Sequence, residues 1–301
     1  MELRKVIIAT KMTGLQYFIH TNNLSSVRDA VVLLTERKVN PERLIKSHYR
    51  QMEELDTLCQ VFSKNKIPYT LIPRGNLTKE LTEDCDLVIS FGGDNHFIYV
   101  AHFSSCPILP INSDPQTSAG YLLQSQKAPK IIEALTTDHF HIQRWPKLNI
   151  NLDGKPIESA VQEILFLERD SWRSSHNTIS WETGGTRAST VHRGSGTILC
   201  NGVGASGWYK NAGGKYHSEP TMREVFLLAR EQFSKLKEYQ DGRFEGDWTI
   251  FKVTSNNDTD GVLVVDCLDE FKYPFMAGSA AEVELSMRNS NETQVIHLDI
   301  F

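Results

Sequence analysis

A glycine pair followed by an aspartate is the first group of residues in this sequence that could do chemistry. Gly92-Gly93-Asp94-Asn95 follows the apolar run Asp86–Phe91, which has the pattern of a buried strand. A strand that passes through glycines into a helix presents backbone N–H groups to a phosphate, and the helix dipole adds to the attraction. Asp94 would then lie at the carboxyl end of a parallel strand, where open α/β folds bind ligands. The alternative is a tight turn with Asp94 as the helix N-cap.

A second glycine-rich stretch lies in the other half of the chain. It runs from Asn201 to Trp208 and is followed by Asn211-Ala212-Gly213-Gly214. Closely spaced glycines beside the small hydroxyl residue Ser206 indicate a close approach of the backbone to a ligand. The ring of Trp208 could stack on a base or a ribose. A flexible loop of a β domain is the alternative for this stretch alone.

Together the two stretches resemble the NAD kinase family. That family carries Gly-Gly-Asp-Gly in its first domain, then an Asp-Gly strand that leads to Thr-Gly-Ser-Thr-Ala-Tyr, and then Ala-Gly-Gly. This chain has Ser195-Gly196, then Gly204-Ala205-Ser206-Gly207-Trp208, then Ala212-Gly213-Gly214, in the same order and nearly the same spacing. The likeness extends over roughly residues 5 to 285.

Two further segments are similar to one branch of that family. Asn112-Ser113-Asp114-Pro115 resembles the Asn-Thr-Asp-Pro of the mitochondrial and plant NADH kinases, and Lys11-Met12-Thr13 also looks like that branch.

Gln162-Glu163 stands where the family has Asn-Glu, a pair that it uses on the nucleoside part of NAD. Glutamine keeps the amide donor and acceptor one methylene further out. An exposed polar pair on an edge strand is the alternative for these two residues.

The resemblance implies a role for each matching residue. Asp94 is the expected catalytic carboxylate, and Asp266 is expected near the dinucleotide, although a lone aspartate at a strand end is more often a turn residue. Arg193 matches a position from which the family contacts its nucleotide. The residues expected to bind nucleotide are Gly92, Gly93, Asn95, Asn112, Asp114, Gln162, Glu163, Arg193, Ser195, Gly204, Ser206, Trp208, Asn211 and Asp266.

By the same resemblance, the chain is expected to transfer the γ-phosphoryl group of ATP to the 2′-hydroxyl of the adenosine ribose of NAD or NADH. Polyphosphate is the other donor that the family suggests. Mg²⁺ would accompany ATP, and no protein metal site is expected because neither the cysteines nor the histidines have a convincing ligand spacing. A homodimer or larger assembly is the implied working form, and the scattered cysteines, taken as reduced thiols, indicate a cytoplasmic location.

Three departures from the family pattern leave other functions open. Asn95 replaces the fourth glycine; asparagine tolerates positive φ, but its side chain would intrude where phosphate should pass. His96 stands in place of a threonine, and Ser195 replaces an aspartate that points at the nicotinamide end. A dinucleotide-binding protein that has lost phosphoryl transfer is therefore one alternative. A lipid kinase, which shares the Gly-Gly-Asp-Gly turn and a β second domain, is another.

Composition bounds the class of protein. The 301 residues are 40% hydrophobic and 23% charged, with a net charge of −5, which is typical of a globular protein and argues against broad binding to nucleic acid or anionic membranes. No apolar run approaches the ~20 residues that cross a bilayer, and the N-terminus has no signal-peptide pattern. The five scattered cysteines indicate reduced thiols. They are Cys59, Cys85, Cys106, Cys200 and Cys267.

The elements that must position these residues fall into two kinds. Up to about residue 140, strand and helix patterns alternate, which predicts a Rossmann-like parallel sheet covered by helices in a domain 1–139. Within it, apolar residues recur every three or four positions after Pro41, which predicts a helix to about Asn65. Alternating strands then predict an all-β domain 140–280, interrupted by a helix over roughly 221–238. The segment 281–301 is expected to return to the first domain.

Overall fold

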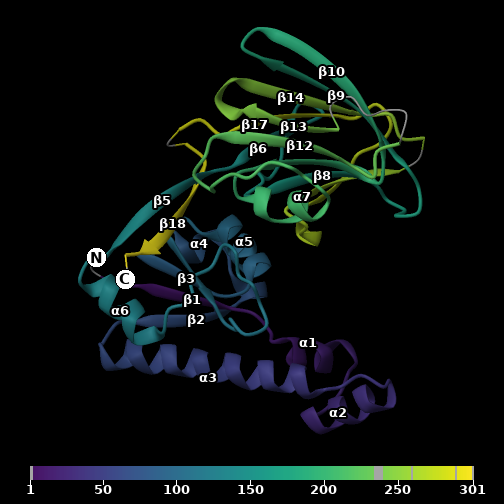
Figure 1. The fold of residues 1–301 in the computed structure, drawn as a ribbon. Coiled ribbons are helices and arrows are strands. Elements are labelled where there is room, and N and C mark those ends of the chain that lie inside the picture. Colours follow the sequence, from purple (N-terminus) through teal and green to yellow (C-terminus); the bar gives the residue numbers. More distant parts are fainter. Residues whose placement is uncertain (1–2, 234–239, 259, 289, 300–301) are drawn as a thin grey trace. The chain divides into compact units, whose positions relative to one another are not determined.

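The computed structural model describes residues 3–233, 240–258, 260–288 and 290–299, and it divides into two compact units (Figure 1). The first comprises Met1–Gln143 and Gln294–Phe301, and the second comprises Arg144–Thr293. The predicted boundaries were 139/140 and 280/281. The predicted C-terminal segment 281–301 is divided between the two units. Its part of strand β17 (Ala280–Leu285) belongs to the second unit, and most of strand β18 (Glu292–Leu298) belongs to the first unit.

A six-stranded sheet forms the centre of the first unit. Its order is β2-β1-β3-β4-β18-β5, and β2, β1, β3, β4 and β18 run parallel. The strands β3 and β4 are buried along their whole length, as expected for a parallel sheet covered on both faces. The bounds are β1 Val6–Thr10, β2 Tyr69–Pro73, β3 Leu87–Gly92, β4 Ile108–Asn112 and β5 Phe140–Pro146. The predicted parallel sheet is confirmed.

Helices cover both faces of this sheet. Helices α3 and α6 lie on one face, where Leu58 and Phe62 of α3 pack with Ile131 and Leu135 of α6, and α5 lies on the other (Figure 1). The helix predicted after Pro41 is confirmed. The bounds are α1 Gly14–Thr21, α2 Val27–Glu36, α3 Glu42–Lys64, α4 Lys79–Thr82, α5 Asp94–Phe103 and α6 Ala128–Thr136. No helix of the described segments is long and apolar enough to cross a membrane.

Two six-stranded antiparallel sheets form the second unit, in the orders β10-β9-β14-β17-β6-β7 and β13-β12-β11-β8-β15-β16. One hydrophobic core lies between them, with Phe251 and Val283 from the first sheet and Phe166 and Leu199 from the second. The predicted all-β domain is confirmed. The bounds are β6 Leu148–Leu152, β7 Lys155–Pro156, β8 Glu163–Glu168, β9 Ser175–Thr183, β10 Thr186–Gly194, β11 Gly196–Asn201, β12 Glu224–Arg230, β13 Asp241–Glu245, β14 Thr249–Ser255, β15 Gly261–Val265 and β16 Lys272–Pro274, with one short helix, α7 Trp208–Asn211.

The helix predicted over 221–238 is wrong where the structure describes it. Residues Glu224–Arg230 form the strand β12, and 234–238 lie outside the described residues. The strand is apolar from Val225 to Ala229 because both of its faces are buried. Leu227 faces the core between the sheets, and Phe226 packs under the Gly204–Trp208 stretch. A strand buried on both faces lacks the alternation that would distinguish it from a helix.

The expectation of five reduced thiols is wrong for one pair, because Cys85 and Cys106 are joined by a disulfide with their Cα atoms 6.2 Å apart. Each cysteine stands just before a strand, β3 or β4, and these strands are parallel neighbours in which Val88 pairs with Ile108. The sheet thus brings together two residues that are 21 positions apart in the sequence.

Candidate functional site

The glycine turn at the end of β3 is crowded at Gly92 and has room at Gly93. Strand β3 ends at Gly92, Gly93 is the N-cap of α5, and the helix begins at Asp94. A Cβ atom on Gly92 would lie 2.6 Å from the His96 ring, and one on Gly93 would lie 3.7 Å from the Lys11 ammonium nitrogen. Gly93 has a φ of −112°, and position 95 is in the first turn of α5. Position 95 does not have a positive φ. The expectation that asparagine stands there because it tolerates positive φ is therefore wrong.

The Asp94 carboxylate is held in place by two backbone groups. Its Oδ2 accepts a hydrogen bond from the N–H of Tyr121 (3.2 Å), and its Oδ1 accepts one from the N–H of Leu122 (3.1 Å). Asp94 is half-buried, whereas the Tyr121 side chain is 75% exposed beside it. Each carboxylate oxygen has a second lone pair, so Asp94 can still accept a proton or a further hydrogen bond.

Two cations lie at the same edge of the sheet. Lys11 follows β1, the neighbour of β3, and Arg74 follows β2 on the other side of β1, where its guanidinium lies 4.1 Å from the centre of the Tyr99 ring of α5. Enclosure of its ammonium group and repulsion from Arg74 lower the pKa of Lys11. Burial, with the charges of Lys11 and Arg74, lowers the pKa of His96 to about 4, so its ring is neutral at pH 7 and donates from Nε2 to the carbonyl of Ala9. The turn therefore combines positive charge with an uncharged histidine.

Asn112 and Asp114, both expected to bind nucleotide, tie the chain after β4 to helix α3. Arg50 donates to both Asp114 oxygens (3.0 and 3.1 Å), and the hydroxyls of Ser47 and Thr117 donate to Oδ2. Burial opposes the charge on this carboxylate, but the hydrogen bonds from Arg50 and the two hydroxyls outweigh it and hold its pKa below the usual value. The Asn112 amide accepts from the Asp114 N–H through Oδ1 and donates to the Ser118 carbonyl through Nδ2.

In the second unit, Asp266 binds backbone and holds the Gln162-Glu163 segment. Its carboxylate accepts hydrogen bonds from the N–H groups of Val161 (2.7 Å), Gln162 (2.9 Å) and Glu163 (2.9 Å), and the residue is 3% exposed. Asp266 and Cys267 both have a positive φ, of 54° and 55°. A positive φ favours glycine, so the backbone at Cys267 has a conformation that a non-glycine residue rarely adopts. Asp266 thus positions the Gln162-Glu163 segment through three backbone hydrogen bonds.

Glu163 is buried, whereas Gln162 is partly exposed. Oε1 of Glu163 accepts a hydrogen bond from the Cys267 thiol (3.1 Å), and Oε2 has no partner among the described residues. Burial raises the pKa of Glu163 to about 7, and the charge of Asp266 acts in the same direction. Glu163 can therefore change its protonation state near neutral pH.

The Gly204–Trp208 stretch lies directly against the Gln162-Glu163 segment. A Cβ atom on Gly204 would lie 2.5 Å from the Gln162 carbonyl oxygen, so only glycine fits there. Asn201 fixes the start of the stretch, because its side chain accepts from the Gly204 N–H and donates to the carbonyl of Val161. The stretch and helix α7 then cover the outer face of the sheet around Phe226.

Three more residues were expected to bind a ligand: Arg193, Ser195 and Asn211. Arg193, near the end of β10, is exposed, and its guanidinium lies 6.0 Å from the Phe233 ring. The Ser195 N–H donates to the Arg230 carbonyl, and its hydroxyl is buried without a partner among the described residues. Asn211 is exposed at the end of α7.

The expected site residues did not include Lys11, Arg74, Tyr121 or Arg230. Lys11 and Arg74 each follow a strand of the parallel sheet, a signal that can be used once the strand order is known. The Arg230 guanidinium lies 4.4 Å from the centre of the Trp208 ring and covers one face of it. The face of Trp208 that Arg230 covers is therefore not available for stacking on a ligand.

Comparison with known proteins supports the resemblance seen in the sequence. No protein-family model matches the chain. A probable NADH kinase of Oryza sativa subsp. japonica is 24% identical over 202 residues, which cover 55% of this chain and 62% of that protein. The NADH kinase of Arabidopsis thaliana is 28% identical over 118 residues (38% and 34%), and an NAD kinase of Bacteroides fragilis is 29% identical over 147 residues (46% and 49%). The matches thus span one third to somewhat under two thirds of these relatives.

The fold is likewise that of an NAD kinase. The crystal structure of an NAD kinase from Archaeoglobus fulgidus in complex with ATP matches with a TM-score of 0.65 over 98% of this chain and 93% of that one. The sequence identity in this match is 15%. The similarity to NAD and NADH kinases that the motifs indicated is therefore confirmed in sequence and in fold.

Proposed function

We propose that this chain is a kinase that transfers the γ-phosphoryl group of ATP to the 2′-hydroxyl of the adenosine ribose of NAD or NADH. The observation that carries the proposal is the position of Asp94, a carboxylate fixed at the carboxyl end of β3 by two backbone N–H groups. It stands in a chain that has the fold of an NAD kinase and resembles NAD and NADH kinases in sequence.

Asp94 would act as the general base. A ribose hydroxyl is a weak acid, so a carboxylate within hydrogen-bond reach assists its attack by accepting the proton. As the 2′-oxygen forms its bond to the γ-phosphorus, the bond from that phosphorus to the β,γ-bridging oxygen breaks and ADP leaves. The N–H groups of Tyr121 and Leu122 would keep the carboxylate oriented during this transfer.

Lys11 and Arg74 would attract the phosphates to the turn, where Gly93 has no side chain between its backbone and the Lys11 ammonium group. The described residues contain no group of three or more His, Cys, Asp or Glu side chains that could hold a metal ion. A Mg²⁺ ion that arrives on the ATP phosphates needs no such group, and Asp94 is the carboxylate that would reach it at the turn. Bound in that way, Mg²⁺ would neutralise phosphate charge in the transition state.

The second unit would bind the dinucleotide. Gln162, which is partly exposed, would offer an amide for hydrogen bonds with the ribose or base, and the partly exposed ring of Trp208 would offer a surface for stacking. Ser206 and Arg193 are the further contacts that the resemblance implies. A homodimer or larger assembly, a cytoplasmic location and the choice between NAD and NADH stay predictions.

A dinucleotide-binding protein without phosphoryl transfer is the second candidate. Two observations favour it: both oxygens of Asp94 already accept a backbone hydrogen bond, and an exposed Asn95 side chain stands where the related family has glycine. The relatives found are NAD and NADH kinases, which favours a dinucleotide over a lipid as the acceptor in either case.

The formation of NADP or NADPH separates the two candidates. Purified protein is incubated with Mg²⁺-ATP, or polyphosphate, and NAD or NADH, and the product is measured by enzymatic cycling. A working kinase should form product, and Asn95→Gly should change its rate by less than about tenfold, or ~1.4 kcal/mol in the barrier. A lapsed enzyme should bind the dinucleotide without product, and Asn95→Gly should then gain activity. Absence of product with every donor and acceptor, despite dinucleotide binding, would contradict our proposal.

A further inference from the structure

The two N–H groups that hold the Asp94 carboxylate come from one loop, residues 113–123, which follows β4. The same loop brings a hydroxyl group to the glycine turn, because a Cβ atom on Gly93 would lie 3.8 Å from Oγ of Ser118. The orientation of the proposed base thus depends on this loop, and a shift of about 1 Å in a catalytic group can slow a reaction about a hundredfold. The contacts that hold the loop are therefore part of the catalytic arrangement.

Both ends of the loop are fixed by backbone hydrogen bonds. At its start, the N–H of Ser113 donates to the carbonyl of Gly92 (3.0 Å). At its end, the carbonyl of Gln124 accepts the N–H of Asn112 (2.8 Å), and the N–H of Gln124 donates to Pro110 (2.9 Å). These bonds close the loop beside β4, and the position of its middle depends on further contacts.

The middle of the loop is folded around Asn112 and Asp114. The N–H groups of Thr117 (3.1 Å) and Ser118 (3.0 Å) donate to the Asp114 carbonyl, and the Thr117 hydroxyl donates to the Asp114 carboxylate. Nδ2 of Asn112 donates to the Ser118 carbonyl (3.1 Å). The loop passes so close to Asn112 that a Cβ atom on Gly120, which has a φ of 59°, would lie 2.4 Å from Nδ2. A displacement of Asp114 would therefore move the loop.

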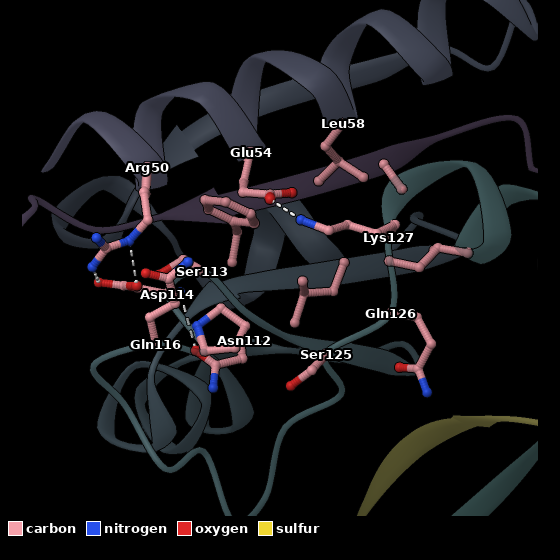
Figure 2. A pocket seen from close by; sticks show the side chains of 15 residues that line it. Arg50, Glu54, Leu58, Asn112, Ser113, Asp114, Gln116, Ser125, Gln126 and Lys127 are labelled. Atoms are coloured by element: carbon pink, nitrogen blue, oxygen red, sulfur yellow. Dashed lines mark hydrogen bonds and ion pairs between the residues drawn. The ribbon is translucent and has the colours of Figure 1, made fainter. Parts of the chain in front are cut away.

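Helix α3 fixes Asp114 with side chains from one of its faces. Ser47, Arg50 and Gln51 are spaced i, i+3 and i+4, so they lie on the same side of the helix. Arg50 donates to both carboxylate oxygens of Asp114, and Ser47 donates to one of them. Gln51 accepts the hydroxyl of Ser113 (3.0 Å). Figure 2 shows Arg50 reaching from the helix to Asp114, with dashed lines for the two hydrogen bonds.

Arg50 makes the strongest of these contacts. The side chains of Arg50 and Asp114 are 27% and 5% exposed, so their ion pair is largely shielded from water. The pair is also two-pronged, a geometry that a guanidinium provides and an ammonium does not. Loss of Arg50 would leave a buried carboxylate with hydroxyl donors alone, which is much more costly than loss of an exposed ion pair. The carboxylate would then turn toward water and draw the loop with it.

We propose that Arg50 is a positioning residue for phosphoryl transfer: through Asp114 and the 113–123 loop, it sets the orientation of Asp94 without contacting the nucleotide. The inference rests on the proposed function, since the kinase reaction is what needs Asp94 as its base. Asp114 serves the site as the link between helix and loop. Its carboxylate is almost fully buried and already accepts hydrogen bonds from a guanidinium and two hydroxyls.

The kinetic test is Arg50→Met, which keeps the length of the side chain but removes its charge and its donors. The kcat for NADP or NADPH formation, per folded molecule and well below the melting temperature, should fall about 10–100-fold, whereas KM for ATP and for the dinucleotide should change less than about threefold. A purely structural role would lower the amount of folded protein and leave kcat unchanged. Arg50→Lys keeps the charge without the fork, and it should be at least about threefold faster than Arg50→Met.

Lys127→Met is the matched control. Lys127 also makes an ion pair with a residue of α3, Glu54, but it lies beyond Gln124, where the loop has ended, and its side chain is 74% exposed. Its kcat should stay within about twofold of the wild type. An equal loss in Lys127→Met and Arg50→Met would overturn the proposal, because any weakening of contacts to α3 would then suffice. An Arg50→Met enzyme that keeps its kcat, or in which only KM changes, would also overturn it.

A double-mutant cycle tests whether Arg50 acts through Asp114. Asp114→Asn alone should also lower kcat, and the Arg50→Met/Asp114→Asn variant should be no more than about threefold slower than the slower single variant. Losses that multiply would overturn the proposal, since Arg50 would then act by another route. If Arg50→Met does not fold, Thr117→Val takes its place: it removes a hydroxyl donor to Asp114 from an exposed residue and should lower kcat about 2–5-fold at unchanged KM. An unchanged kcat in Thr117→Val would then overturn the proposal.

Hydrogen exchange tests the positioning without any turnover. In a peptide that contains residues 118–123, the Tyr121 and Leu122 amides should exchange at least about tenfold faster in Arg50→Met than in the wild type or in Lys127→Met, since they exchange when the loop leaves the carboxylate. A wild type that forms no product would contradict the kinase proposal, whereas this exchange would still decide whether Arg50 holds the loop. Equal exchange in Arg50→Met and in the wild type would overturn the role of Arg50.

Discussion

Replacing Asp266 by asparagine should destabilise the second unit by about 2–4 kcal/mol, a large share of the 5–15 kcal/mol that typically stabilises a domain. The carboxylate is 3% exposed, with Oδ1 accepting the N–H groups of Gln162 and Glu163 and Oδ2 accepting that of Val161. An asparagine oxygen can keep two of these hydrogen bonds without the help of a charge. Its NH₂ group would then face the third N–H, so that two buried donors oppose each other.

Asp153→Asn is the matched control. Asp153 also has a positive φ, of 51°, but it is exposed and accepts one hydrogen bond, from the Ala280 N–H through Oδ1. Asparagine keeps that acceptor, so the expected change is within about 0.5 kcal/mol. The comparison therefore isolates the buried carboxylate from the general effect of an asparagine at positive φ.

Tryptophan fluorescence in urea follows the second unit selectively, because all five tryptophans lie within Arg144–Thr293. With a typical urea slope of 1–3 kcal/mol per molar, Asp266→Asn should lower the midpoint by about 1 M or more. A midpoint within the range of the Asp153→Asn control would refute the assignment of Asp266 as the residue that holds the Gln162-Glu163 segment. The tryptophans are Trp145, Trp172, Trp181, Trp208 and Trp248.

Gly92→Ala should destabilise the first unit by about 1–3 kcal/mol, because the new Cβ would lie 2.6 Å from the His96 ring; a melting temperature equal to that of wild type would contradict this. Burial raises the pKa of Glu163 from 4.5 to about 7. The folded state therefore binds the proton more tightly, and stability should fall by about 3 kcal/mol as the pH rises from 4.5 to 7. Glu163→Gln should flatten the stability–pH curve over that interval, and an unchanged slope would refute the assignment. Cys267→Gly should be more stable than Cys267→Ala by about 1 kcal/mol, since position 267 has a φ of 55°; equal urea midpoints would show that no strain is relieved.

The parts of the fold that the sequence predicts are those with a short-range pattern. The strand before Gly92 and the helix after Pro41 follow from local composition and periodicity, and both are present. Strand β12 was mistaken for a helix because burial of both its faces removes the alternation of apolar and polar residues. The Cys85–Cys106 disulfide depends on the register of two parallel strands, which local sequence does not contain.

The candidate site shows the same division. The motif residues Asp94 and Gly204 stand in the turn and the close contact that glycine-rich stretches predict. The role of Asp266 was not predictable, because its partners lie more than a hundred residues earlier in the chain. Arg230, which covers one face of Trp208, likewise comes from a strand whose position depends on the whole sheet.

The most direct test of Asp94 as the catalytic base is the rate of NADP or NADPH formation by Asp94→Asn, measured beside the affinity of the same variant for NAD or NADH. Asparagine is nearly the same size as aspartate and can still accept the N–H of Tyr121 or Leu122, but it cannot accept a proton. If Asp94 is the base, turnover should fall about 10²–10⁴-fold while the dinucleotide Kd changes less than about threefold. A variant that keeps more than about half of the wild-type rate would contradict the assignment of Asp94 as the base, since a positioned base contributes at least ~10²-fold.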